Sequence, residues 1–264
     1  MRVVSVVFVV VSVLSASVAA AQPKPPPWIL APGKVRATAT VEMDASQGKF
    51  AKPVSLAPDI AVGVHPRLTL ELGHSTFFVT GFRGAAGRGL CLTGDDKGCA
   101  KLYNNLGAEA TFAAITGPIS VAANVGFHAI NLDAGFYAAK IGAKARAAHG
   151  AWIFTSMPSV FIAATHRDGQ KDTLWVPVAA NLRVRKDLLV GVGSGVKGPL
   201  DGFSTAWEVP VGFSTTWNPL PALGVGASWV FGKLLGGAED PAAPAPPATG
   251  VRYRVVHAWV SYTL

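Results

Sequence analysis

Hydrophobic and polar positions alternate over short stretches of this chain, and the last stretch shows the pattern most clearly. Its apolar residues occupy every second position up to the final residue: Val256, Ala258, Val260, Tyr262 and Leu264. His257, Ser261 and Thr263 lie between them. A period of two indicates a β-strand with one apolar face.

Similar stretches recur along the chain and are separated by connections that alternate in length. We expect strands at 34–43, 58–64, 67–80, 103–115, 119–131, 135–147, 151–165, 173–185, 188–197, 203–217, 222–234 and 251–264. Tight turns are expected at 65–66, 116–118, 148–150, 186–187 and 218–221, and longer loops at 44–57, 81–102, 166–172, 198–202 and 235–250, with 132–134 a short exception. The pattern predicts an all-β fold, a transmembrane antiparallel up-and-down β-barrel of about 12 strands, within a range of about 10–14.

The faces of these strands indicate a membrane barrel rather than a soluble sandwich. In 173–185, Val176 and Val178 share one face, whereas Arg183 and Arg185 share the other. A soluble sheet would carry a polar face rich in Lys and Glu, but here that face is sparse and its charges lie towards strand ends. Pro158, Pro177 and Pro210 fall inside expected strands, where we expect bulges or strand ends. The rival architecture is a bundle of membrane helices, for which 119–139 and 150–165 come closest.

The first 32 residues do not fit the strand pattern. Arg2 and the apolar run that follows it predict a signal peptide over 1–21, cleaved after Ala21; an uncleaved anchor is the alternative. Residues 22–32 are rich in proline and predict an extended periplasmic lead with little packing. The barrel is assigned to 33–264, in the outer membrane of a Gram-negative-type bacterium.

Charge and cysteine content narrow the partners. The chain has 23 Lys and Arg against 15 Asp and Glu, a net charge of +8, but its basic residues are dispersed. This dispersal favours anionic headgroups or solutes over nucleic acid. Cys91 and Cys99 predict a disulfide that closes a loop tip. The chain has no HExxH or CxxC motif, and we expect neither a metal nor a cofactor.

The signal peptide and the strand pattern together resemble small bacterial outer-membrane β-barrel proteins of the porin-like class, without a motif for a subfamily. The terminal strand is the sharpest point of resemblance, since it looks like the signal that the barrel-assembly machinery reads. That signal usually ends in Phe or Trp, whereas this chain ends in Leu264 and has Tyr262 as its outward aromatic residue. The resemblance implies that outer-membrane lipid and the assembly machinery are partners.

Inward-facing charges are the best functional clue, because ionisable groups at membrane depth must be paired or wetted. The candidates for the lumen are Arg36, Arg67, Glu71, Glu109, Lys140, Lys144, Arg146, Arg183, Arg185, Lys197 and Glu208. Their basic excess favours a narrow passive channel for small solutes, with anions as the favoured class. The alternative is a non-conducting structural or surface-recognition barrel with a salt-bridged lumen, its loop at 81–102 facing outward.

Two further patterns in the sequence concern chemistry. His74 beside Ser75, and Ser120 on the strand of His128, leave a lipid-modifying hydrolase as a minor alternative, although we expect no enzyme. The glycines of 190–195 lack the strand–loop–helix setting of a phosphate loop. We expect such inward glycines to leave room for bulky neighbours such as Trp175 or Trp259.

Overall fold

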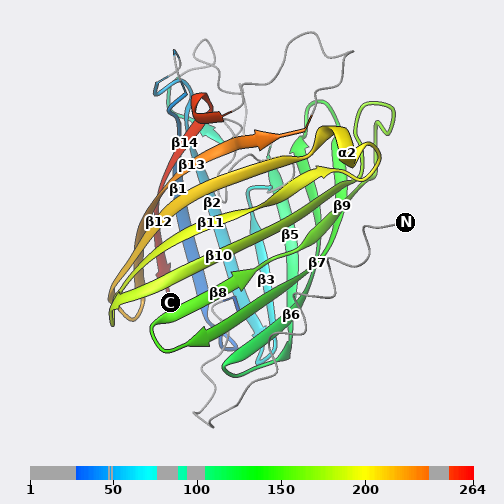
Figure 1. Ribbon diagram of the computed structural model, residues 1–264. Helices are drawn as coiled ribbons and strands as arrows, with labels where there is room; N and C mark the ends of the chain where they lie inside the picture. The colour runs from blue at the N-terminus through cyan, green and yellow to red at the C-terminus, as the bar shows by residue number, and fades with distance from the viewer. Residues whose placement is uncertain (1–27, 47, 49, 76–88, 94–104, 238–249) are drawn as a thin grey trace.

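The computed structural model describes residues 28–46, 48, 50–75, 89–93, 105–237 and 250–264, which form one closed antiparallel sheet (Figure 1). The sheet closes because β1 (Val35–Asp44) pairs with both β2 (Val54–His65) and β14 (Arg254–Thr263). The other strands are β3 (Leu68–Gly73), β4 (Leu90–Cys91), β5 (Leu106–Ile115), β6 (Ile119–Asn131), β7 (Phe136–His149), β8 (Trp152–Ser156), β9 (Ser159–Ala163), β10 (Thr173–Arg185), β11 (Leu188–Pro199), β12 (Glu208–Leu220) and β13 (Leu223–Gly236).

The wall has twelve strand positions within the described part of the chain. β8 and β9 together fill one position between β7 and β10, and the two-residue β4 pairs only with β2. The expected barrel and its strand number are therefore confirmed. The rival helical spans at 119–139 and 150–165 are instead β6, the start of β7, and β8 with β9.

Helical structure is brief in the described residues. α2 (Phe203–Ala206) and η2 (Gly250–Arg252) each precede a strand. The strand expected at 203–217 therefore begins only at Glu208, after α2, and the strand expected from 251 begins at Arg254, after η2. No helix among the described residues is long and apolar enough to cross a membrane.

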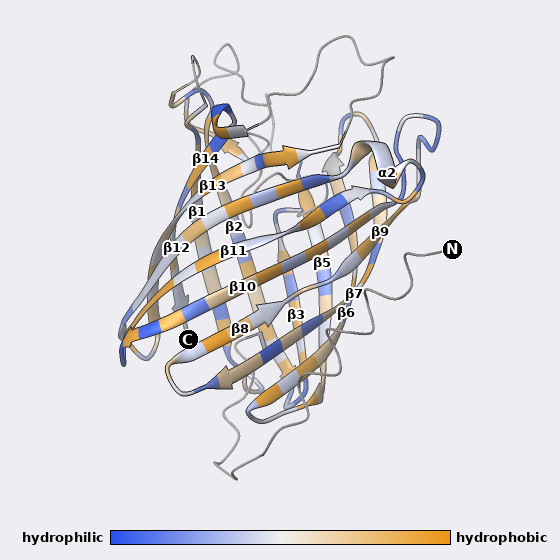
Figure 2. Cartoon of the chain, in the orientation of Figure 1, coloured by the Kyte–Doolittle hydropathy of each residue, from blue (hydrophilic) through white to orange (hydrophobic). Residues whose placement is uncertain are grey.

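Apolar and polar residues alternate along the strands, as the hydropathy colours in Figure 2 show, and their burial assigns them to an outer and an inner face. On β6, Val125 and Phe127 are exposed, whereas the neighbouring Asn124 and His128 are buried. On β10 the exposed apolar residues are Val178 and Val184. A surface that is apolar outside and polar within is the arrangement of a membrane-spanning barrel.

The connections differ between the two ends of the barrel. The short links after β2, β5, β7, β10 and β12 all lie at the end that holds the C-terminus (Figure 1), which we call the short-turn end. The longer described links at 164–172 and 200–207 lie at the opposite end, which we call the long-loop end, whereas 76–88, 94–104 and 238–249 are outside the described residues. The expected alternation of turns and loops is therefore confirmed for the described links, and most of the loops expected at 81–102 and 235–250 lies outside the described residues.

The three prolines mark irregularities in the wall, although not always in their own strand. Pro158 separates β8 from β9, and Pro210 lies where the pairing of β12 with β13 shifts register. Pro177 continues its pairing with β11, and the gap lies instead in the adjacent strand. There the Pro177 carbonyl accepts hydrogen bonds from the Met157 N–H at 3.3 Å and the Ser156 hydroxyl at 2.8 Å.

Candidate pore and its charged lining

Glu109 is the centre of a charged cluster on the inner wall. Its Oε1 accepts a hydrogen bond from Lys140 Nζ at 2.5 Å, and its Oε2 accepts one from Asn124 Nδ2 at 2.9 Å. Glu109, Gly126 and Lys140 are in register across β5, β6 and β7. Because the middle residue is glycine, no side chain separates the carboxylate from the ammonium group.

Lys144 completes this cluster, four residues beyond Lys140 on β7 and nearer the short-turn end. Its Nζ donates to Thr111 Oγ1 at 3.0 Å and lies 3.7 Å from Glu109 Oε2. A cavity of about 200 Å³ opens inside the barrel beside the cluster, and Glu71 and Trp175 also line it. Glu71, Glu109, Lys140 and Lys144 are thus brought together in the lumen, as the alternation predicts.

Two buried rows of contacting serine, histidine and glutamate side chains, which we call relays, lie on the inner face of the wall. In the first, Ser75 Oγ lies 3.0 Å from His128 Nδ1, and His128 Nε2 lies 3.2 Å from Glu109 Oε1. The second joins residues of β13, β14 and β1: Ser228 Oγ is 3.0 Å from His257 Nδ1, and His257 Nε2 is 3.3 Å from Glu42 Oε2.

The burial of these relays argues against hydrolysis. Ser75 is fully buried, and Ser228 of the second relay is 9% exposed beside the fully buried His257. A nucleophilic serine must reach its substrate, and neither hydroxyl is placed to do so. Their repetition at two positions of the wall fits a structural role. Sequence reasoning noticed His74, Ser75 and His128, but it could not show that Ser75 meets the histidine of a distant strand.

A second charged cluster surrounds Glu208 on β12. Lys197 Nζ lies 4.0 Å from Glu208 Oε2, and Lys233 Nζ lies 3.4 Å from Oε1. Lys233 is absent from the sequence-based candidates, because strict alternation from the outward Trp229 would turn it towards lipid. The register shift between β12 and β13 places it inside instead.

Arg146 and Arg183 form a different kind of feature near the short-turn end. Both occupy inward positions, on β7 and β10, and their charges interact. Among the described residues neither guanidinium has an ion-pair partner, in contrast to the four lysines above. Arg36 occupies an inward position of β1 at the same end.

Two predicted lumen residues prove to lie outside it. Arg67 is exposed in the turn between β2 and β3. Arg185 follows a register shift at the end of β10 and pairs with Asp187 at 3.0 Å. A hydrogen bond from the Trp217 indole N–H, 3.0 Å long, holds the pKa of Asp187 below its usual value. Alternation does not predict the direction of either side chain. Arg67 lies in a turn outside β2 and β3, and Arg185 follows the register shift at the end of β10.

The terminal strand presents its predicted face to the outside. Outward positions are held by the residues of the proposed assembly signal: Val256, Ala258, Val260, Tyr262 and Leu264. Trp259 points inward, where a Cβ on Gly226 would lie only 2.2 Å from its Cζ2. The expected pairing of an inward glycine with a bulky neighbour is therefore confirmed at this position.

Some expectations fall partly or wholly outside the described residues. Cys91 ends β4, but Cys99 is among the residues not described, so their disulfide stays a prediction. The same holds for the signal peptide over 1–21. In the part of the chain that the structure describes, no three His, Cys, Asp or Glu side chains gather as a metal site.

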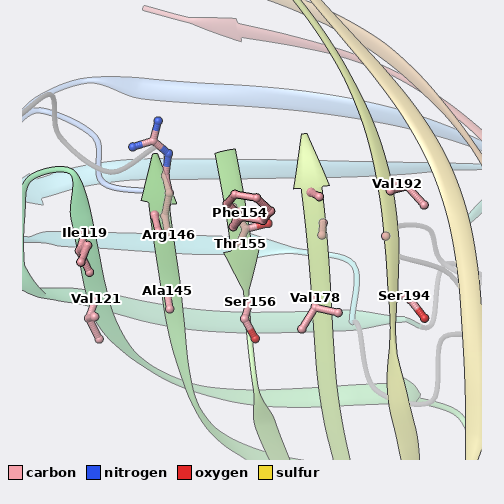
Figure 3. A pocket seen from close by; sticks show the side chains of 14 residues that line it. Ile119, Val121, Ala145, Arg146, Phe154, Thr155, Ser156, Val178, Val192 and Ser194 are labelled. Atoms are coloured by element: carbon pink, nitrogen blue, oxygen red, sulfur yellow. The ribbon is translucent and has the colours of Figure 1, made fainter. Parts of the chain in front are cut away.

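A hollow of about 570 Å³ lies on the outer face of the wall, not in the lumen (Figure 3). Apolar outward side chains such as Val121, Phe154 and Val178 line it. The hydroxyls of Ser156 and Ser194, which also line it, donate hydrogen bonds to the carbonyl oxygens of prolines in neighbouring strands. It therefore offers lipid an apolar surface and has no part in a pore.

No protein-family model and no curated protein matches this chain. Solved structures do match it in shape. The NanC porin is 9% identical with a TM-score of 0.56, and the match covers 87% of this chain and 100% of the porin. The KdgM porin, in complex with disordered oligogalacturonate, is 8% identical with a TM-score of 0.54, covering 86% and 98% respectively. At these identities the likeness concerns the fold, and in its fold the chain is a closed β-barrel of the outer-membrane porin type.

Proposed function

We propose that this protein is a narrow passive channel of the bacterial outer membrane for small solutes, with a preference for anions. The apolar outer face and the porin fold support the membrane setting. The preference rests on one observation: Arg146 and Arg183 lie inside the barrel without an ion-pair partner among the described residues.

The balance of charge around the lumen explains why this pair matters. Glu109 offsets part of the charge of Lys140 and Lys144, and Glu208 does the same for Lys197 and Lys233. Two arginines without a carboxylate leave a positive field at the short-turn end. Rings of basic side chains favour anions in pores. The KdgM porin was captured with an oligogalacturonate, which is an acidic oligosaccharide, and this supports the same class of solute.

The orientation and location of the channel follow from its turns. Short turns face the periplasm in outer-membrane barrels, so the short-turn end with Arg146 and Arg183 is the periplasmic mouth. The longer links would then face the cell exterior. The predicted signal peptide over 1–21 agrees with export.

The test is ion selectivity of the mature chain in planar lipid bilayers. In a KCl gradient we expect a reversal potential whose sign shows that Cl⁻ is more permeant than K⁺. The double variant Arg146→Glu, Arg183→Glu should lose this preference. Arg167→Glu is the control, because this exposed arginine of the 164–172 loop undergoes the same substitution at the long-loop end, and each single variant, Arg146→Glu or Arg183→Glu, matches its charge change. Equal selectivity of the double variant and the wild type would refute the assignment.

A structural or surface-recognition barrel is the second candidate, and the clusters around Glu109 and Glu208 favour it. Ion-paired side chains can fill the lumen and stabilise the wall instead of lining an open pore. A folded protein without conductance would support this candidate. The heat-dependent shift of a folded barrel on a gel would establish that such a silent protein is folded.

A further inference from the structure

Residues 28–33 precede the barrel wall but lie inside it, at the short-turn end. The Leu30 N–H donates to Thr69 Oγ1 at 2.8 Å, and Thr69 is a buried inward residue of β3. Ile29 and Leu30 are buried, with only 5% and 8% of their surface exposed. A proline-rich lead is not expected to pack, so this placement is a feature that the sequence alone does not predict.

Gly63 on β2 makes the close approach possible. It lies directly opposite Thr69 and shares its inward direction. A Cβ at Gly63 would lie 2.1 Å from the Ala31 carbonyl oxygen and 2.7 Å from that of Leu30. Backbone atoms of the segment thus occupy the place that any other side chain would fill.

Hydrogen bonds between backbones hold the segment at its C-terminal side. The Gly33 N–H donates to the Gly63 carbonyl at 2.8 Å, and the Gly63 N–H donates to the Lys34 carbonyl at 2.9 Å. The segment is therefore fixed to β2 and β3 at both Leu30 and Gly33.

We infer that residues 28–33 form a constriction at the short-turn mouth that limits the size of solutes. This inference rests on the proposed channel function. The segment covers the wall at β2 and β3, whereas Arg146 and Arg183 lie on β7 and β10, with β5 and β6 between β3 and β7. A solute crossing this mouth would pass between an apolar lip and two cations.

Two variants test the constriction in the full mature barrel. Removal of 22–32 eliminates the lip and leaves Gly33 and Lys34 bonded to β2. Gly63→Ala instead displaces the lip by a steric clash with the Ala31 carbonyl. Gly169→Ala is the matched control, because a Cβ there meets nothing within 4 Å.

Single-channel conductance and the passage of sugars of increasing size into vesicles are the measurements. We expect both variants, but not the control, to raise conductance by about twofold or more and to admit larger sugars, since the lumen is wider without the lip. Anion preference should persist, because the arginines are untouched. Heat-dependent gel mobility shows which variants have folded.

The outcomes separate this inference from the proposed function. Equal conductance of the wild type and the folded variants overturns the constriction and leaves the channel. A silent wild type with conducting variants supports a lip that closes the mouth and overturns the passive channel. If every folded barrel is silent, both ideas fail.

Discussion

At the scale of single residues, the lumen depends on carboxylates that each serve more than one partner. Glu109 accepts hydrogen bonds from Lys140 and Asn124 and lies near His128 and Lys144. A carboxylate shared in this way places one negative charge beside two lysines in a confined space. Its loss leaves both without their nearest anion.

We therefore expect Glu109→Gln to destabilise the barrel by about 3 kcal/mol, because removing one member of a buried pair strands the other charges. The measurement is equilibrium unfolding by urea in lipid vesicles. Asp201→Asn is the control: its carboxylate lies 3.8 Å from Lys171 Nζ, but the two side chains are 94% and 53% exposed. Such an exposed pair contributes less than about 1 kcal/mol. Equal losses in the two variants would contradict a central role for Glu109.

At the scale of strands, neighbouring residues meet different surroundings because the wall is one layer thick. Val178 and Ala179 are adjacent on β10, yet Val178 faces outward and is 47% exposed, whereas Ala179 faces the lumen. Both pair within the same ladders, with β8 and β11. They form a matched pair for a test of the two faces.

Val178→Arg should cost about 2–4 kcal/mol of barrel stability, because the guanidinium would face hydrocarbon near the middle of the strand. Ala179→Arg places the same group in a polar lumen, so its cost should be clearly smaller. Urea unfolding in vesicles compares the two free energies. A larger loss for Ala179→Arg would show that the faces have been assigned the wrong way round.

Strand periodicity explains which elements could be predicted from the sequence. The expected strands at 119–131 and 173–185 match β6 and β10 in full, because apolar and polar residues alternate over most of their length. Lys233 was missed because a register irregularity reverses its direction, and Arg185 was misplaced for the same kind of reason. The contacts of Ser75 with His128 and of Leu30 with Thr69 join segments far apart in the chain, and periodicity carries no information about them.

At the scale of the whole molecule, closure depends on the two ends of the described barrel. β14 pairs with β1 from Arg36 opposite Thr263 to Asp44 opposite Val255, and Leu264 and Val35 exchange backbone hydrogen bonds. Without this seam both β1 and β14 would have an open edge in lipid, where unpaired backbone groups are costly. The last strand must therefore be delivered correctly for the barrel to form.

The outward side chains of β14 are suited to recognition because they take no part in the backbone hydrogen bonds that pair β14 with β1. Tyr262 and Leu264 are 49% and 68% exposed, and their replacement by serine would preserve every backbone bond of the ladder. The double variant Tyr262→Ser, Leu264→Ser should thus retain the capacity to close. What it should lose is the apolar pattern that we propose the assembly machinery reads.

We expect this double variant to assemble poorly in vesicles that contain the barrel-assembly machinery, and to fold much more nearly like the wild type in detergent without it. Ser261→Ala with Thr263→Ala is the control, since these residues occupy the inward positions of the same strand. The folded fraction is read from heat-dependent gel mobility. Equal loss in vesicles and detergent would assign the two side chains to stability alone. A loss of folded protein only in vesicles with the machinery would show that these two side chains act in recognition. The pairing of β14 with β1 would then be a separate role of the same strand.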